Sequence, residues 1–121
     1  MAPAIENMPR NMKYFCTDIK QHELFNETCG AFATIDVGHA HTNNAVTDFL
    51  QVDVPVAYYH LSDNDGERDL HLPIGKGTID WTQLKGINKA IIEVNDCTAV
   101  KESRDHLAQM IRVQSCDLTG G

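Results

Sequence analysis

Three short apolar runs constrain the fold of this chain more than any other feature of its sequence. They are rich in β-branched and aromatic side chains and span residues 31–37 (AFATIDV), 54–61 (VPVAYYHL) and 90–94 (AIIEV). Polar and apolar residues alternate only weakly within them, which is typical of strands buried on both faces of a parallel sheet. A shorter piece at residues 4–6 (AIE) indicates the end of another strand near the start of the chain.

Segments with helical character separate the apolar runs. The first covers residues 18–29 and the second, a short candidate, covers residues 43–51. The apolar residues expected to line these helices are Ile19, Leu24, Phe25, Val46, Phe49 and Leu50. Strands that alternate with helices predict βα units with right-handed crossovers, and therefore an α/β fold built on a parallel sheet.

Two further helices are expected in the second half of the chain. Asp80 is followed three residues later by Gln83, a spacing typical of a capping box at the start of a helix. Thr98 is a candidate cap for the last helix. The apolar stripe of that helix would consist of Val100, Leu107 and Ile111.

Composition narrows the class of protein. With 121 residues and 42% hydrophobic residues, the chain can form one domain with a core, which we place at residues 1–114, before a flexible tail at residues 115–121. The net charge is −7 and lysine and arginine form no block, so electrostatic binding to nucleic acid is not indicated. Because no signal peptide is visible and no apolar run approaches the ~20 residues of a membrane span, we expect a cytoplasmic protein.

Polar residues recur at the carboxyl end of each expected strand. These residues are Glu6, Asp36, His60 and Glu93. In a (β/α) barrel this end of the sheet carries the active site, and carboxylates and imidazoles bind divalent metals of the zinc or manganese type. Taken singly, each residue is more often a helix cap or a solvated loop residue, but one ligand per strand predicts a catalytic metal site. Glu93 lies within an apolar run, where an unpaired carboxylate would be costly without a cation.

A second group of candidate ligands lies close by in the chain. Four of the six histidines fall between residues 39 and 71. We expect His39, Asp69 and His71 in the site. The alternatives are a capping or loop role for His39 and, for Asp69 and His71, a hydrogen-bonded pair that shapes the loop.

The other histidines and the cysteines are expected to have structural roles. His41 is a weaker candidate for the site, and His22 and His106 lie on expected helices and should be at the surface. The four cysteines form no CxxC pair and no zinc-finger spacing, so we expect buried thiols in a reducing compartment. They are Cys16, Cys29, Cys97 and Cys116.

Several motifs, taken in order, resemble a known superfamily. IENMP at residues 5–9, IDVGHAH at 35–41, YYHLSDNDGERDLHLPIGKGTIDW at 58–81 and IIEV at 91–94 look like the second half of xylose isomerase-like TIM barrels. This group includes sugar-phosphate isomerases and epimerases, inosose dehydratase and endonuclease IV. The resemblance covers residues 4–112 and implies about half of a TIM barrel, with strands equivalent to strands 5 to 8 of the complete fold.

A complete barrel of this kind has eight strands and about 250 residues. The resemblance therefore implies that the chain is a truncated piece, one part of a split enzyme, or a half-barrel that completes itself by pairing. Unpaired sheet edges favour aggregation, and a two-fold homodimer would bury them. A missing half-barrel or a second copy is thus an expected partner, besides a small sugar-like substrate.

The resemblance also implies roles for particular residues. Glu6, Asp36, His60 and Glu93 match the four metal ligands of the sugar epimerases. Glu6 and Glu93 would in addition be the acid–base pair on either side of the substrate carbon. His39 would contact the substrate. In endonuclease IV, whose site holds three zinc ions, zinc ligands also stand at the positions of His39, Asp69 and His71.

Three functions follow as hypotheses. The first is a sugar or sugar-phosphate isomerase or epimerase that uses Mn²⁺ or Zn²⁺, with Mg²⁺ and Co²⁺ as alternatives. The second is a zinc phosphodiesterase that acts on abasic DNA. The third is a half-barrel without catalysis that serves as a metal-binding or assembly module.

Overall fold

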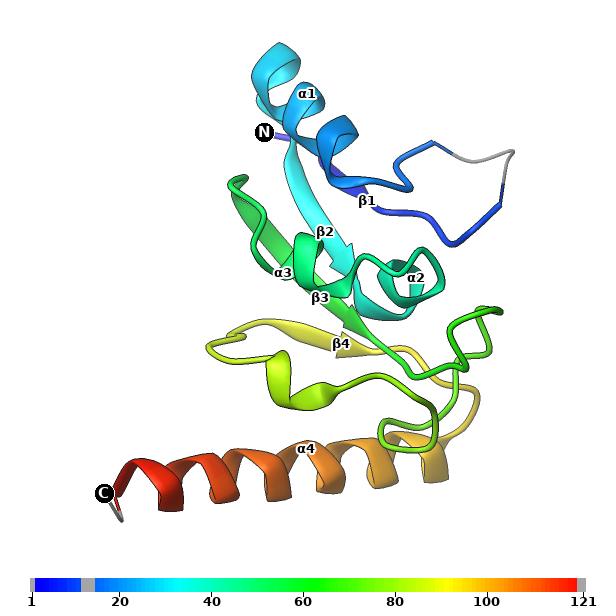
Figure 1. Cartoon of the computed structure of the whole chain (residues 1–121), viewed down its shortest axis with the longest axis vertical. Helices are drawn as coiled ribbons and strands as arrows, with labels where there is room; N and C mark the ends of the chain where they lie inside the picture. Colours follow the sequence, from blue (N-terminus) through cyan, green and yellow to red (C-terminus); the bar gives the residue numbers. More distant parts are fainter. Residues whose placement is uncertain (1, 12–14, 120–121) are drawn as a thin grey trace.

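Four parallel strands form one sheet in the order β1-β2-β3-β4 (Figure 1). The computed structural model describes residues 2–11 and 15–119, with side chains up to residue 110. The strands are β1 (Ala4–Glu6), β2 (Phe32–Asp36), β3 (Val56–Leu61) and β4 (Ala90–Ile92). The expected α/β fold with a parallel sheet is confirmed, and each strand is found within its expected run.

Helices connect the strands. The helices are α1 (Ile19–Cys29), α2 (Val37–Thr42), α3 (Val46–Leu50), the 3₁₀ helix η1 (Trp81–Gln83) and α4 (Cys97–Thr119). All of those described except α3 begin at an aspartate that caps them. Asp18 caps α1, because its carboxylate accepts hydrogen bonds from the backbone N–H groups of Lys20 and Gln21. Gly30 ends α1 with φ 70°, a left-handed conformation that suits glycine.

Three expectations about helices need correction. Only the three-residue η1 forms where a helix was expected after Asp80, although the Asp80 side chain caps it by accepting the N–H of Thr82. The last helix is capped by Asp96, not by Thr98, since the Asp96 carboxylate accepts the N–H of Ala99 at 2.8 Å. Of the expected apolar stripe of α4, Leu107 packs against the core but Val100 is exposed. The side chain of Ile111 lies outside the described part.

Helix α2 was not expected at all. It follows β2 without a loop, and the Asp36 carboxylate caps it by accepting the N–H of His39. At the other end of the chain, α4 runs to Thr119, so the backbone is helical in part of the expected tail. The flexibility of residues 115–121 and the domain limit at residue 114 stay predictions, and Gly120 and Gly121 lie outside the described residues.

The core lies on one face of the sheet only. Ala33 and Ile35 of β2 are fully buried against the helices, together with Phe49 of α3. Side chains on the opposite face remain accessible, because Tyr58 and Ile91 are each 47% exposed. The strands were expected to be buried on both faces. This holds for residues 33–36 of β2, where Thr34 and Asp36 are also buried, but not for β3 and β4.

The helix α1 packs through an unexpected side chain. His22 is 2% exposed and its Nε2 lies 3.1 Å from the backbone oxygen of Ile5, whereas Leu24 is 60% exposed. The ring of His22 also packs edge-on against Phe49. His22 is therefore a core residue and not the surface residue we expected. His106 is half-buried beside Gly75.

The cysteines only partly match expectation. Cys16 is buried, but Cys29 and Cys97 are exposed, and all three are free thiols. The side chain of Cys116 lies outside the described part. Within the described residues, no helix is long and apolar enough to cross a bilayer.

Candidate metal centre

The four strand-end residues meet at one edge of the sheet. Each offers a ligand atom that lies within 4.8 Å of the ligand atoms of the others, and the group is Glu6, Asp36, His60 and Glu93. The strand register explains this meeting, because Asp36 pairs with His60 across β2 and β3. Paired residues of a parallel sheet point to the same face, so carboxyl ends that lie in register bring their side chains together.

His60 lies between two carboxylates from opposite edges of the sheet. Its Nδ1 atom is 3.0 Å from Oε1 of Glu6 and 3.3 Å from Oε1 of Glu93. Glu93 follows the last residue of β4 and is still bonded to the sheet, since its N–H donates to the Leu61 carbonyl. Its side chain is 37% exposed, so Glu93 is not the buried carboxylate that the sequence indicated.

Asp36 is the buried member of this cluster. Its side chain is 1% exposed, and one carboxylate oxygen, Oδ1, accepts the N–H of His39. The other oxygen, Oδ2, has no hydrogen-bond partner among the described residues, and it lies 3.5 Å from Nε2 of His39, an ion pair when that ring is protonated. A buried carboxylate oxygen without a donor is costly, and a cation would remove that cost.

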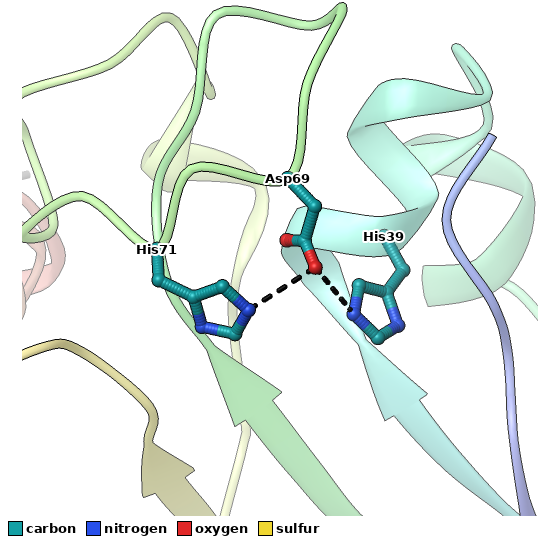
Figure 2. Close-up of side chains that lie close together, drawn as sticks. All are labelled: His39, Asp69 and His71. Carbon is teal, nitrogen blue, oxygen red and sulfur yellow. Dashed lines mark hydrogen bonds and ion pairs between the residues drawn. The ribbon is translucent and has the colours of Figure 1, made fainter.

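A second cluster adjoins the first and consists of His39, Asp69 and His71 (Figure 2). The Nε2 atoms of the two histidines lie 3.0 and 3.1 Å from the same oxygen, Oδ2 of Asp69. Their Nδ1 atoms face backbone carbonyl oxygens, of Asn7 at 2.7 Å and of Glu93 at 2.9 Å. A carbonyl only accepts hydrogen bonds, so each Nδ1 carries a proton.

This arrangement leaves both Nε2 atoms directed at one carboxylate oxygen. A neutral ring with its proton on Nδ1 has a lone pair on Nε2, which a carboxylate repels. The contact is favourable when Nε2 carries a second proton or when a cation lies between the groups. Metal-binding histidines commonly donate their other N–H to a carbonyl in this way. The second cluster therefore has the donor set and orientation of a metal site.

Charges within the clusters shift the pKa values of their members. Burial raises the pKa of Asp36 to about 6, and the negative charges of Glu6 and Asp69 add to the effect of burial against the opposing effect of His39. Burial alone would lower the pKa of His39, but the hydrogen bond to Asp69 and the charge of Asp36 outweigh it and raise the pKa to about 9. A proton on His39 thus partly neutralises the acidic cluster, and a bound cation would take over this role.

The loop after β3 holds the second cluster in place. His71 has φ 51°, a left-handed conformation that is uncommon for a residue with a side chain. Such conformations persist where the surrounding structure enforces them. In this loop Asp63 and Asn64 are fully buried, and their side chains hydrogen-bond to other parts of the chain and so hold the loop.

Sequence reasoning found the seven candidate ligands but missed the residues that support them. Asn7, Asp63 and Asn64 are each 0% exposed. Nothing in the local pattern distinguishes them from loop residues, except that Asn7 directly follows a candidate ligand. His41 belongs to neither cluster, since its Nε2 atom lies 2.7 Å from the hydroxyl of Thr78.

Comparisons with known proteins identify the fold. No family model matches the chain. It is 33% identical over 103 residues to the uncharacterized protein MJ1614 of Methanocaldococcus jannaschii, an alignment that covers 85% of this chain and 41% of that protein. A second uncharacterized protein of this organism, MJ1311, is 33% identical over 55 residues, which are 42% of this chain and 19% of that protein. The chain thus spans less than half the length of these relatives.

A solved structure gives the architectural comparison. The structure of a D-tagatose 3-epimerase-like protein matches with a TM-score of 0.82 and 21% sequence identity, over 98% of this chain and 49% of that chain. The expected half of a TIM barrel, with four parallel strands alternating with helices, is therefore confirmed as the fold of this chain.

Proposed function

We propose that this chain supplies the metal-binding half of an isomerase or epimerase that acts on a sugar or sugar phosphate. The observation that carries the proposal is the meeting of four ligands, one from each strand end, within 4.8 Å. The epimerase-like fold of the matching solved structure supports the same reading.

The residues present fit a divalent metal. Glu6, Asp36, His60 and Glu93 combine three carboxylates with one imidazole, a donor set that suits Mn²⁺ or Zn²⁺, and also Mg²⁺ or Co²⁺. The Oδ2 atom of Asp36 supports this assignment, because it is buried and accepts no hydrogen bond among the described residues. A bound divalent ion would act as a Lewis acid toward a substrate carbonyl oxygen.

The two glutamates are suited to proton transfer. Glu6 and Glu93 extend from opposite edges of the sheet, are 29% and 37% exposed, and both contact His60. In the proposed reaction, one of these carboxylates takes the proton from the carbon next to the carbonyl and the other returns a proton to the same carbon from the opposite side. His39 would hold a substrate oxygen through hydrogen bonding.

Catalysis by this arrangement is proposed for a complete barrel. The sheet face that carries the candidate ligands also exposes Phe32, Tyr58 and Ile91, which are 40%, 47% and 47% exposed. Apolar side chains gathered on one face mark a surface that another element covers. We therefore propose that four further βα units cover this face, provided by a longer chain, by a separate subunit or by a second copy.

A second candidate function is a zinc phosphodiesterase that acts on abasic DNA. The cluster of His39, Asp69 and His71 favours it, because its histidine Nε2 atoms are directed at a shared carboxylate oxygen like ligands of a further metal. The net charge of −7 favours the isomerase instead, since a chain with this balance attracts a DNA backbone poorly.

Metal counting combined with a proton-exchange assay separates these functions. The chain would be purified alone and together with the remaining half-barrel, loaded with Mn²⁺ or Zn²⁺, and incubated with ketoses and ketose phosphates in D₂O. For an isomerase we expect one metal per site and incorporation of deuterium at the carbon next to the carbonyl. The metal content should be the same in His71→Asn. Asparagine is the matched replacement, because it tolerates the left-handed backbone of residue 71.

The rate of deuterium exchange should depend on the two glutamates. Replacing Glu93 with glutamine removes a proton acceptor, so exchange measured at a metal concentration that saturates the site should fall by at least about 100-fold. Three metals per complete site, with a loss in His71→Asn, would favour the phosphodiesterase. A stable monomer on a sizing column that binds metal, and that shows no exchange even with the other half added, would leave the non-catalytic module as the better account.

A further inference from the structure

The first strand is followed by a buried asparagine, Asn7, whose side chain takes over hydrogen bonding to the neighbouring strand. The register between β1 and β2 ends at Glu6, which pairs with Thr34, and the last backbone bond joins the Asn7 N–H to the Thr34 carbonyl at 3.4 Å. The next residue, Asn7, is 0% exposed, and its side-chain amide makes two hydrogen bonds to the backbone of Asp36. Its Oδ1 atom accepts the Asp36 N–H at 2.6 Å, and its Nδ2 atom donates to the Asp36 carbonyl at 2.9 Å.

These two hydrogen bonds replace those that a backbone peptide group of a longer β1 would make to Asp36. A side-chain amide offers the same donor and acceptor as a backbone peptide, so Asn7 holds Asp36 as another residue of β1 would have done. The strand can therefore leave the sheet immediately after Glu6 without leaving the Asp36 backbone unpaired. This keeps the Glu6 side chain at the last position of the strand, next to Asp36.

The backbone of Asn7 acts on a third candidate ligand. Its carbonyl oxygen lies 2.7 Å from Nδ1 of His39, and this contact turns Nε2 of the ring toward Asp69. Asn7 thus touches the first cluster through Asp36 and the second through His39. It is itself a ligand in neither cluster.

We propose that Asn7 is a positioning residue that fixes the two candidate metal clusters relative to each other. The proposal rests on the proposed metal centre, but its structural part can be tested without metal. Positioning predicts that the side chain of Asn7 controls the orientation of His39, although only the backbone of Asn7 contacts that ring. A residue that merely joined two strands would leave the ring of His39 unchanged.

Two replacements of Asn7 distinguish the loss of its N–H donor alone from the loss of the whole side-chain amide. Alanine removes both bonds to Asp36. Aspartate has the same shape and keeps the acceptor for the Asp36 N–H, but it places a carboxylate oxygen against the Asp36 carbonyl. The matched control is Asn26→Ala, because Asn26 also donates from Nδ2 to a backbone carbonyl, that of Ala31, at the far end of β2.

The experiment records the ring N–H signals of the 121-residue chain in ¹H–¹⁵N spectra at fixed pH, with His39→Gln to assign the His39 signal. We expect a slowly exchanging Nδ1–H signal in the unaltered chain and in Asn26→Ala. In Asn7→Ala and Asn7→Asp the signal should be lost to solvent exchange. Affinity for Co²⁺, followed by its absorption spectrum, should fall by about 10- to 100-fold in the two Asn7 variants only.

Each outcome bears on the proposal. If the His39 signal and the Co²⁺ affinity survive in both Asn7 variants, or if Asn26→Ala loses them equally, Asn7 has no positioning role. If Asn7→Ala does not fold, the isosteric Asn7→Asp gives the same comparison. If the unaltered chain binds no Co²⁺ but its His39 signal still depends on Asn7, the positioning role holds and the proposed metal function fails.

Discussion

Replacing Asp36 with asparagine should stabilise the chain without metal at neutral pH and strongly weaken its binding of a divalent ion. Asp36 is 1% exposed, and its Oδ2 atom has no hydrogen-bond partner among the described residues. Burial, followed by the charges of Glu6 and Asp69, raises its pKa from 3.8 to about 6. The ionised carboxylate is therefore disfavoured in the folded chain relative to the unfolded chain.

The direction of the pH dependence follows from this shift. A raised carboxyl pKa means that the folded chain holds this proton up to a higher pH than the unfolded chain. The contribution of Asp36 to stability thus falls as the pH rises from about 4 to above 6, and at neutral pH the cost is complete. Asparagine carries no charge, so we expect the free energy of unfolding at pH 7.5 to rise by about 1 to 3 kcal/mol.

Metal binding should change in the opposite sense. An amide is a poor ligand compared with a carboxylate, and removing one ligand of four should lower affinity by at least about 100-fold. Urea unfolding at pH 4.5 and 7.5 with chelator, and calorimetric titration with Zn²⁺ and Mn²⁺, measure the two effects. The control is Asp18→Asn, which changes an exposed helix cap that belongs to neither cluster. A variant that loses stability at pH 7.5 or keeps its metal affinity would show that Asp36 has a structural role instead.

The meeting of the four strand-end residues was predictable because it depends on topology more than on detailed packing. Parallel strands place their carboxyl ends at one edge of the sheet, so a polar residue at each end is brought to the same place. This reasoning needs only the order of strands and the position of each residue within its strand. Asp36 and His60 are indeed direct partners in the register.

The supporting residues depend on contacts between distant parts of the chain, which no local pattern reveals. Asn7 bonds to Asp36, 29 residues away, and Asn64 donates to the Gly38 carbonyl, 26 residues away. Helix α2 was missed for a related reason. Its sequence contains a glycine and directly follows a strand, and its start depends on the Asp36 cap.

His22 shows the same limit on a helix face. The apolar residues of α1 suggested a buried face that includes Leu24, yet the polar ring of His22 is buried and Leu24 is exposed. The His22 ring can be buried because its Nε2 atom lies 3.1 Å from the Ile5 carbonyl oxygen. A polar side chain can enter a core where a partner exists, and the sequence does not display that partner.

The largest loss of stability is expected when Asp63 is replaced with alanine. This carboxylate is 0% exposed and organises the loop after β3. Its Oδ1 atom accepts the N–H groups of Asn64 at 2.9 Å and Ile79 at 3.2 Å. Its Oδ2 atom accepts the N–H of Gly75 at 3.0 Å and the indole N–H of Trp81 at 2.8 Å.

Alanine at this position would leave three buried N–H donors without an acceptor, those of Asn64, Ile79 and the Trp81 indole, besides the more exposed N–H of Gly75. Each unsatisfied buried donor costs about 1–3 kcal/mol, and because the loop can partly relax we expect a total loss of about 4 kcal/mol. Urea unfolding at neutral pH measures this loss. Asp65→Ala is the matched control, since Asp65 also accepts backbone N–H groups, those of Glu67 and Arg68, but in an exposed part of the same loop.

The same substitution should also disturb the second metal cluster, because Asp69 and His71 belong to the loop that Asp63 holds. The Nδ1 atom of His71 reaches the Glu93 carbonyl at 2.9 Å only while the loop lies against β4. In Asp63→Ala we therefore expect the ring N–H of His71 to exchange freely with solvent, whereas in Asp65→Ala it should stay protected. Equal losses of stability in the two variants, or a protected His71 ring in Asp63→Ala, would mean that the loop is held by its apolar contacts through Ile74, Ile79 and Trp81 and that the buried carboxylate contributes little.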